Sequence, residues 1–177
     1  MILRLAHCVA MWCALAAAVS AEPARPTVAV FDFELIDTSL EGTLRGPRDD
    51  ERARLAHVGT QLRERLRESG RFDVLDVAPV AGEAAASNLQ SCGGCDIALA
   101  KRIGAELAIT GTVQKVSNLI LNMNIYVRDV SAETTVAVMS ADMRGNTDES
   151  WSRALDWLVR NRLLAPDYGM RRSDPPR

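Results

Sequence analysis

The sequence predicts a single α/β domain, an α+β mixed fold in which helices pack on one mixed five-stranded sheet in the order β-α-β-α-β-β-β-α. A nearly continuous apolar run over 28–35 is typical of a strand that is covered on both faces. Helical spacing over 49–70 and 95–104 separates the first three strands, and right-handed crossovers make such strands parallel. The two-residue link at 117–118 then favours an antiparallel hairpin.

The composition excludes several classes of protein. The 177 residues are 47% hydrophobic, 25% charged and 5% aromatic, which is ordinary for a globular protein and not for a disordered or polytopic membrane chain. The formal net charge is −2. A mildly acidic chain lacks the basic surface that binding to a phosphate backbone requires, so nucleic acid is not an expected partner.

The N-terminus has the features of a secretory signal. Arg4 precedes an apolar run over 8–19, and the small residues at 19–21 match the site that signal peptidase recognises. We therefore expect residues 1–21 to be a cleavable signal peptide, and the exported product to reach the periplasm without a stable membrane span. An uncleaved N-terminal anchor is the alternative.

Residues 22–165 are expected to form the single domain, and residues 166–177 a flexible C-terminal tail. The first strand is expected over 27–36, and a long polar loop follows over 37–48. The next helix, over 49–70, carries apolar residues at helical spacing, namely Leu55, Val58, Leu62 and Leu66.

A second strand is expected over 71–77, a short helical turn over 83–89, and a helix from Cys95 or Asp96 to Gly104. The remaining strands are expected over 106–116, 119–130 and 134–144.

The last helix begins at a sequence that resembles a capping box, Asn146-x-x-Glu149. Trp151 and Trp157 lie on this helix, and we expect both to anchor the core. In total, three helices are expected to clad the sheet.

The first candidate site lies at the carboxyl ends of the parallel strands, where ligands bind in open sheets of this kind. The segments 37–48 and 78–91 are expected to emerge together at that edge. The first of them is longer than most connections, which favours a functional loop, and a solvated connection is the alternative. Its candidate partner-binding residues are Asp37, Thr38, Arg45 and Arg48.

The second candidate site is a polar stripe on the fourth strand. Because side chains alternate along a strand, its apolar residues share one face and its polar residues share the other. The stripe can hydrogen-bond a partner, and simple solvent exposure is the alternative. It consists of Asn122, Asn124, Tyr126 and Arg128.

The two cysteines outside the signal are Cys92 and Cys95, separated by two glycines. In an exported protein, this spacing favours a structural disulfide. A redox pair is the first alternative, because a helix N-terminus stabilises a thiolate. A metal pair with His57 is the second, and it has too few ligands to predict a zinc site.

Asp32 and Glu34 interrupt the apolar first strand, so we expect them to be buried with a partner. The expected partners are Arg128, Arg144 or Lys115, and the N-termini of helices. The chain holds no Gly-x-Ser-x-Gly, no phosphate-cradling loop and no dinucleotide fingerprint. We therefore expect no catalytic residue, no metal site and no cofactor.

The chain resembles a bacterial family of predicted secreted proteins of unknown function over about 27–164. The stretches that carry the resemblance are 28–35, 92–96, 111–118 and 144–151. At the level of the fold it is similar to the amino-terminal domain of TolB and to CsgG- and LpoB-like envelope proteins, through the Val-Ala-Val-Phe-Asp-Phe opening and the segments 103–105 and 109–113.

These fold-level relatives act by protein–protein contact in the envelope, so the resemblance implies a non-catalytic periplasmic or secreted accessory protein. Its expected partner is another envelope or secreted protein. Two alternatives remain: a thiol–disulfide redox protein that uses Cys92 and Cys95, and a protein that binds a small ligand at the loop edge 37–48.

Overall fold

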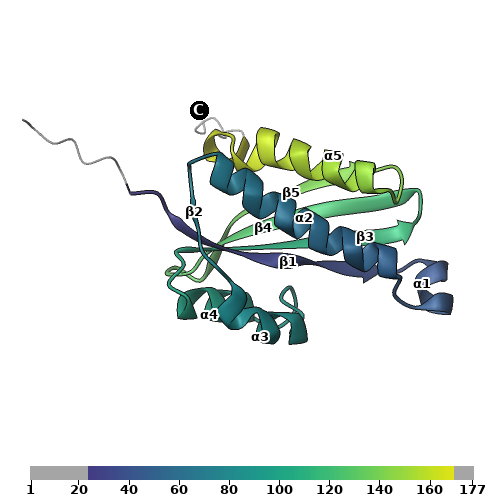
Figure 1. The fold of residues 1–177 in the computed structure, drawn as a ribbon, viewed down its shortest axis with the longest axis horizontal. Helices are drawn as coiled ribbons and strands as arrows, with labels where there is room; N and C mark the ends of the chain where they lie inside the picture. Colours follow the sequence, from purple (N-terminus) through teal and green to yellow (C-terminus); the bar gives the residue numbers. More distant parts are fainter. Residues whose placement is uncertain (1–23, 170–177) are drawn as a thin grey trace, which may run out of the picture.

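The computed structural model describes residues 24–169, so the expected signal peptide 1–21 and residues 170–177 of the expected tail lie outside the described residues. The architecture confirms the predicted mixed sheet (Figure 1). The strands are β1 (Thr27–Asp37), β2 (Asp73–Val74), β3 (Leu107–Ser117), β4 (Ile120–Asp129) and β5 (Thr134–Met143). The α-helices are α1 (Leu40–Arg45), α2 (Asp49–Glu68), α3 (Ala81–Ala86), α4 (Cys95–Arg102) and α5 (Asp148–Leu158). Shorter helical turns are η1 (Ala78–Val80), η2 (Val159–Leu163) and η3 (Pro166–Gly169).

The strand order in the sheet is β2-β1-β3-β4-β5. β1 pairs in parallel with β2 and with β3, whereas β3, β4 and β5 form two antiparallel hairpin pairs. The parallel core and the antiparallel hairpins are therefore both as predicted. The tight link between β3 and β4 explains the second arrangement, because a two-residue connection joins only antiparallel strands.

Helices cover the two faces of the sheet unequally (Figure 1). α2 and α5 lie along one face and bury the larger core, in which Trp151 and Leu155 of α5 pack with Val58, Leu62 and Leu66 of α2. α3 and α4 lie against the other face only at the end where β1 begins, and they bury a smaller core around Phe31 and Ile97. The rest of this second face has no helix on it.

β1 supplies both cores, as its continuous apolar run predicted. Val28 and Val30 point into the larger core, and Ala29 and Phe31 point into the smaller one. The pairing with β3 shifts register between Val30 and Phe33. This bulge adds one residue to β1, which leaves Asp32 exposed instead of buried.

The second strand is shorter than the predicted 71–77, because only Asp73 and Val74 pair with β1. Beyond them, Leu75 and Val77 pack against the smaller core. Leu75 still donates its N–H to the Val28 carbonyl at 2.9 Å, and the chain then leaves the edge of the sheet.

Two helices exceed the predicted three. The segment 37–48 is not a plain loop, since it contains α1, whose first turn is capped by the Ser39 hydroxyl accepting from the Gly42 N–H at 3.0 Å. The helical turn expected over 83–89 lies earlier, as α3. Both helices are six residues long, and so short a run gives no clear periodic pattern in a sequence.

The start and the exposed side of α5 correct two further predictions. Thr147, not Asn146, caps the helix, because its hydroxyl accepts from the Ser150 N–H at 3.2 Å. Trp151 is fully buried as expected, but Trp157 is 44% exposed and is not a core anchor. After η2, the turn η3 brings Tyr168 against the larger core, so packed structure extends past residue 165.

Between residues 24 and 169, none of the helices has both the length and the apolar character that crossing a membrane requires.

Gly111 gives a direct test of the β1–β3 register. It pairs with Phe33, and a Cβ at this position would meet the Phe33 ring. We expect Gly111→Ala to lower the free energy of unfolding by about 1–3 kcal/mol, because the ring has to move out of a packed core. Urea denaturation measures this difference.

Gly82→Ala in α3 is the matched control, since a Cβ there meets no atom. It is expected to leave stability unchanged or to raise it by up to about 1 kcal/mol, the helix preference of alanine over glycine. Equal effects of the two substitutions would contradict the register described here.

Candidate functional site

The candidate site is the part of the sheet that no helix covers, which we call the open sheet face. Side chains alternate along each strand, so those that face away from α2 and α5 form one surface. The register places its members side by side across four strands. The open sheet face consists of Ile36 from β1, Gln114 and Val116 from β3, Ile120, Asn122 and Tyr126 from β4, and Val138, Ser140 and Asp142 from β5, with the buried side chains of Thr112 and Asn124 between them.

The predicted polar stripe lies largely on this face, and its amides bind their cross-strand neighbours. Asn122 donates to Asp142 at 2.8 Å. Asn124 donates to the Thr112 hydroxyl at 3.4 Å and accepts from Ser140 at 2.5 Å. These paired groups form a fixed pattern of donors and acceptors rather than a fringe of mobile side chains. The Tyr126 hydroxyl makes no hydrogen bond to any residue that the structure describes, so it is free to bind a partner.

Arg128, the fourth residue of the stripe, serves a different purpose. Its guanidinium donates to Asp96 at 2.8 Å, and the Asp96 carboxylate is fully buried at the start of α4. The pair therefore joins α4 to β4. Because removal of one partner would leave a buried charge unpaired, this arginine is better explained by the fold than by binding.

Apolar side chains on the open sheet face were not predicted. Ile36, Val116, Ile120 and Val138 are 38%, 58%, 61% and 48% exposed. Sequence alternation contained a signal for Ile120, which shares its face with Asn122 and Tyr126. The sequence did not show which β3 residues lie beside Ile120, because the β3–β4 pairing shifts register between Lys115 and Ser117, next to this position.

A buried cation, Lys115, holds the segment 37–48 against the end of β3. The side chain of Lys115 is completely buried, and its Nζ lies 3.1 Å from Asp37 Oδ2, 3.5 Å from Glu41 Oε2 and 2.6 Å from Glu51 Oε1. We call these four residues the buried ion cluster. One cation at the end of β3 therefore binds β1, α1 and α2 together.

The electrostatics of the cluster follow from these contacts. Burial would lower the pKa of Lys115, but its hydrogen bonds to Glu51 and Asp37 outweigh burial and raise the pKa. Burial would likewise raise the pKa of Asp37, but hydrogen bonds from Ser39 and Lys115 lower it. The hydrogen bond from Asn118 and the charges of Arg48 and Lys115 lower the pKa of Glu41. The charged forms of Lys115, Asp37 and Glu41 are therefore favoured at neutral pH.

The predicted loop residues are mostly held by this cluster and its surroundings. Arg48 pairs with Asp50 at 2.7 Å and with Glu41 at 3.2 Å. Its two hydrogen bonds and positive charge hold the pKa of Asp50 well below the ordinary value. The Thr38 hydroxyl donates to the Lys115 carbonyl at 3.3 Å, and Arg45 lies exposed 3.7 Å from Glu41. Of the four predicted loop residues, Thr38 and Arg45 are exposed, whereas Asp37 and Arg48 are bound within the molecule.

Asn146 extends the network to α5, which sequence reasoning missed by assigning it as a helix cap. Its Nδ2 donates to Glu51 at 2.6 Å and to Asn118 at 3.1 Å. Its Oδ1 accepts from the Trp151 indole N–H at 3.0 Å. An asparagine just before a helix is a common cap, so its residue type alone favoured the wrong role.

The two segments 37–48 and 78–91 do not meet at one edge. β2 ends beside Val28, near the start of β1, so the chain after β2 runs under the sheet and not beyond its carboxyl end. The Leu89 N–H donates to Glu34 at 2.6 Å, and Arg63 of α2 pairs with Asp32 at 2.9 Å. The cations expected for Asp32 and Glu34 were therefore wrong, because the β1 bulge turns Asp32 outward and a backbone N–H binds Glu34.

A hollow of about 330 Å³ does lie at the loop edge, between α1 and α2. Its polar lining includes Asp37 and Arg48, which are already paired. Binding of a small ligand there stays a prediction.

Cys92 and Cys95 are joined by a disulfide that closes the turn before α4. Cys95 packs against the smaller core, and Cys92 is exposed. The bond fixes the point where α4 begins, which fits the structural role predicted from the spacing. Redox activity of this pair stays a prediction.

Within residues 24–169, no group of three or more histidine, cysteine, aspartate or glutamate side chains is arranged to hold a metal ion. His57 is exposed on α2.

The buried ion cluster predicts how stability responds to loss of its cation. Lys115→Met keeps an apolar stem but leaves the three carboxylates without their shared partner. We expect the free energy of unfolding at pH 7 to fall by about 3–5 kcal/mol, the usual cost of an uncompensated buried charge. Urea denaturation measures the change, and Lys101→Met, on the exposed surface of α4, is expected to stay within about 0.5 kcal/mol of the parent.

The deficit of Lys115→Met is expected to shrink on acidification. Asp37 and Glu41 have lowered pKa values in the folded protein, so they stabilise it above the ordinary carboxylate pKa of about 4 and lose this contribution as the pH falls through their folded values. Without Lys115 much of that contribution is already absent. A deficit of constant size between pH 7 and pH 3 would show that the carboxylates do not depend on Lys115.

Comparison with solved structures finds similar folds in proteins of distant sequence. The LpoB C-terminal domain from Salmonella enterica is 12% identical, with a TM-score of 0.49 over 70% of this chain and 87% of that one. The PelC dodecamer from Paraburkholderia phytofirmans is 12% identical, with a TM-score of 0.47 over 84% and 90%. TolB from Acinetobacter baumannii is 11% identical, with a TM-score of 0.44 over 80% of this chain and 29% of that one.

No curated protein matches the sequence. Residues 26–163, which cover the whole sheet and all five α-helices described, match one family. The chain belongs to the family described as Protein of unknown function (DUF2380).

Proposed function

We propose that this protein is a non-catalytic accessory protein of the cell envelope, and that it docks through the open sheet face onto another envelope or secreted protein. The single observation that carries the proposal is the exposure of four large apolar side chains on a sheet face that no helix covers. They are Ile36, Val116, Ile120 and Val138.

The chemistry of the face favours a protein partner over a small molecule. Apolar side chains in contact with polar neighbours are typical of protein–protein interfaces. The amides of Asn122 and Asn124 are already paired with side chains of the same face, so they present few unsatisfied groups for a small polar ligand. The surface extends over four strands, which suits a broad partner better than the concave site that a small ligand requires.

The face is also rigid, which lowers the entropic cost of binding. The strands that carry it are backed by the larger core, in which Ile109, Val113, Met123 and Ile125 are fully buried. The buried ion cluster fixes the end of β3, one residue from Val116. Partner binding would therefore order few additional groups.

Two further observations support the remaining parts of the proposal. The sequence of residues 1–21 has the features of an export signal, which supports a place in the envelope. The acids of the buried ion cluster share Lys115, and the hydroxyl of the neighbouring Ser39 caps α1, so these groups already have structural partners, which supports a role without catalysis.

Photo-crosslinking in living cells tests the proposal. A photoreactive amino acid is placed singly at Val138 and at Ile120 on the open sheet face, and at His57 and Glu64 on the exposed side of α2. We expect the same discrete adduct from both open-face positions and none from the two α2 positions, because only the first pair would lie in the interface.

A charge placed on the face supplies the matched comparison. Ile120→Glu is expected to reduce the Val138 adduct at least about tenfold, because a desolvated carboxylate opposes docking. Leu44→Glu on α1, an equally exposed leucine outside the face, is expected to leave the adduct unchanged. Adducts from the α2 positions alone, or none from the open face under any growth condition, would refute the proposal.

A further inference from the structure

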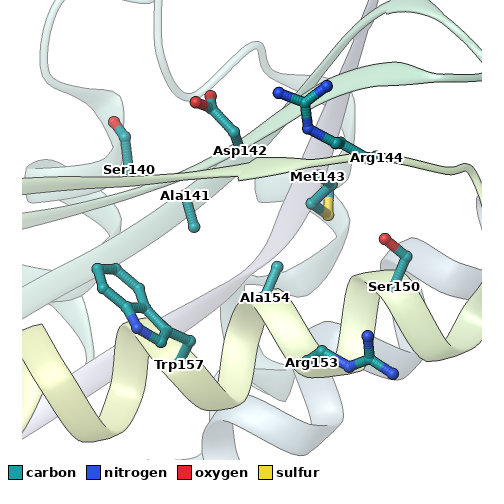
Figure 2. Close-up of a pocket in the computed structure, with 9 residues that line it drawn as sticks. All are labelled: Ser140, Ala141, Asp142, Met143, Arg144, Ser150, Arg153, Ala154 and Trp157. Atoms are coloured by element: carbon teal, nitrogen blue, oxygen red, sulfur yellow. The ribbon is translucent and has the colours of Figure 1, made fainter.

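A groove separates the edge strand β5 from helix α5, on the side of the sheet opposite the open face. Figure 2 shows Ala141 and Met143 pointing from β5 toward α5, with Ala154 and Trp157 opposite them. The hollow measures about 490 Å³. Two alanines leave room for an incoming side chain, and the exposed indole of Trp157 forms one wall. We call this the β5–α5 groove.

The strand that borders the groove has a free hydrogen-bonding edge. β5 is the last strand of the sheet, so half of its backbone N–H and C=O groups point away from β4. Within the described part of the chain, no loop or turn donates a backbone hydrogen bond to this edge or accepts one from it.

This edge also lacks most of the features that prevent strand addition. The sequence of β5 contains no proline and no lysine. Its one bulge, opposite Val127 and Arg128, precedes the run 137–143, which pairs with β4 in regular register. A regular, unblocked edge of this length is a template for another extended strand, because its donors and acceptors already have the spacing of a sheet.

The charges beside the groove favour an acidic occupant. Arg153 lines the groove from α5, whereas Arg144 lies at its rim and points away from α5, on the same side of β5 as Asp142 (Figure 2). Arg144 makes no ion pair with any residue that the structure describes. Arg153 pairs with Glu149, but both side chains are mostly exposed, so the pair is weak. Asp142 lies on the other side of β5 (Figure 2), where it accepts from Asn122.

We propose that the β5–α5 groove binds an extended segment of a partner protein as a sixth strand of the sheet. The backbone of that segment pairs with residues 137–143. Alternate apolar side chains enter the hollow beside Ala154 and Trp157. Acidic side chains lie near Arg153 on this side of the added strand and near Arg144 on its other side. A second copy of this chain is a poorer occupant, since a symmetric contact would bring both copies' arginines into one interface.

The groove shares β5 with the open sheet face, and Ser140 and Asp142 belong to both, so the test uses probes and variants that separate the two surfaces. Selection from a displayed library of random peptides of about twelve residues, long enough to span one strand, supplies the probe. We expect the purified protein to select peptides in which apolar residues alternate with polar ones and at least one acid is present. Selection of no peptide above background overturns the proposal.

The best selected peptide is then titrated into isotope-labelled protein. We expect amide shifts over 137–143 and around Ala154, and at least about tenfold slower hydrogen exchange at the outward-facing amides of β5. Shifts centred on Asn122 and Tyr126 instead would overturn the proposal. So would a dimeric free protein whose β5 amides are already protected, because a second copy would then occupy the edge.

Variants separate the groove from the rest of the surface. The double substitution Arg144→Glu with Arg153→Glu is expected to weaken peptide binding at least about tenfold, and Ala154→Leu to abolish it by filling the hollow. Arg160→Glu lies outside the groove and is expected to change binding less than about twofold, as is Ile120→Glu on the open sheet face. An equal loss of peptide affinity in the double arginine variant and in Arg160→Glu would overturn the proposal. The double arginine variant gives this result even if Ala154→Leu fails to fold.

Discussion

The placement of Lys115 under three carboxylates governs how one end of this sheet is assembled. A lysine ammonium loses its hydration when it is buried, and here Asp37, Glu41 and Glu51 replace the lost water. These acids come from the end of β1, from α1 and from the first turn of α2. Any other arrangement of these three elements would leave a buried charge unpaired, so the cluster specifies their positions even where its net contribution to stability is small.

The cluster acts together with an unequal division of the two faces of the sheet. The helices α2 and α5 pack along one face, and Trp151 lies buried where they meet. On the other face α3 and α4 cover only the end of the sheet where β1 begins, held there by Arg128 with Asp96 and by the Cys92–Cys95 disulfide. The larger core supports the remaining area of the sheet on one side, and no helix covers its other side. This area is therefore suited to docking.

The elements that the sequence predicted correctly are those whose pattern is local and long. Three patterns repeat over several turns or pleats, so tertiary contacts did not alter the predicted element. They are the apolar run of β1, the helical stripe of α2, and the alternation of Leu121, Met123, Ile125 and Val127 in β4. The disulfide likewise followed from the spacing of the two cysteines together with the expected export signal. The polar stripe was placed on the correct face because a period of two leaves only two faces to choose from.

The features that were missed depend on contacts between distant segments. No local pattern shows that Asp32 leaves the sheet at a bulge, that Lys115 binds Glu51, 64 residues away, or that Asn146 bridges α2 to the β3–β4 link. Trp157 was taken for a core residue because it lies near the apolar stripe of α5, yet it falls just outside it. Six-residue helices such as α1 are decided by a cap and a few tertiary contacts, here Ser39 and Glu41.

The most direct test of the account is whether the open sheet face is covered in the cell. A single cysteine at Val138 is labelled with a small maleimide in intact cells and in the purified protein, with a cysteine at Arg67 of α2 as reference. If a partner occupies the face, labelling at 138 is at least about tenfold slower in cells while the reference reacts equally in both, because a docked partner excludes solvent and reagent. Equal rates at 138 in cells and in solution would contradict the account.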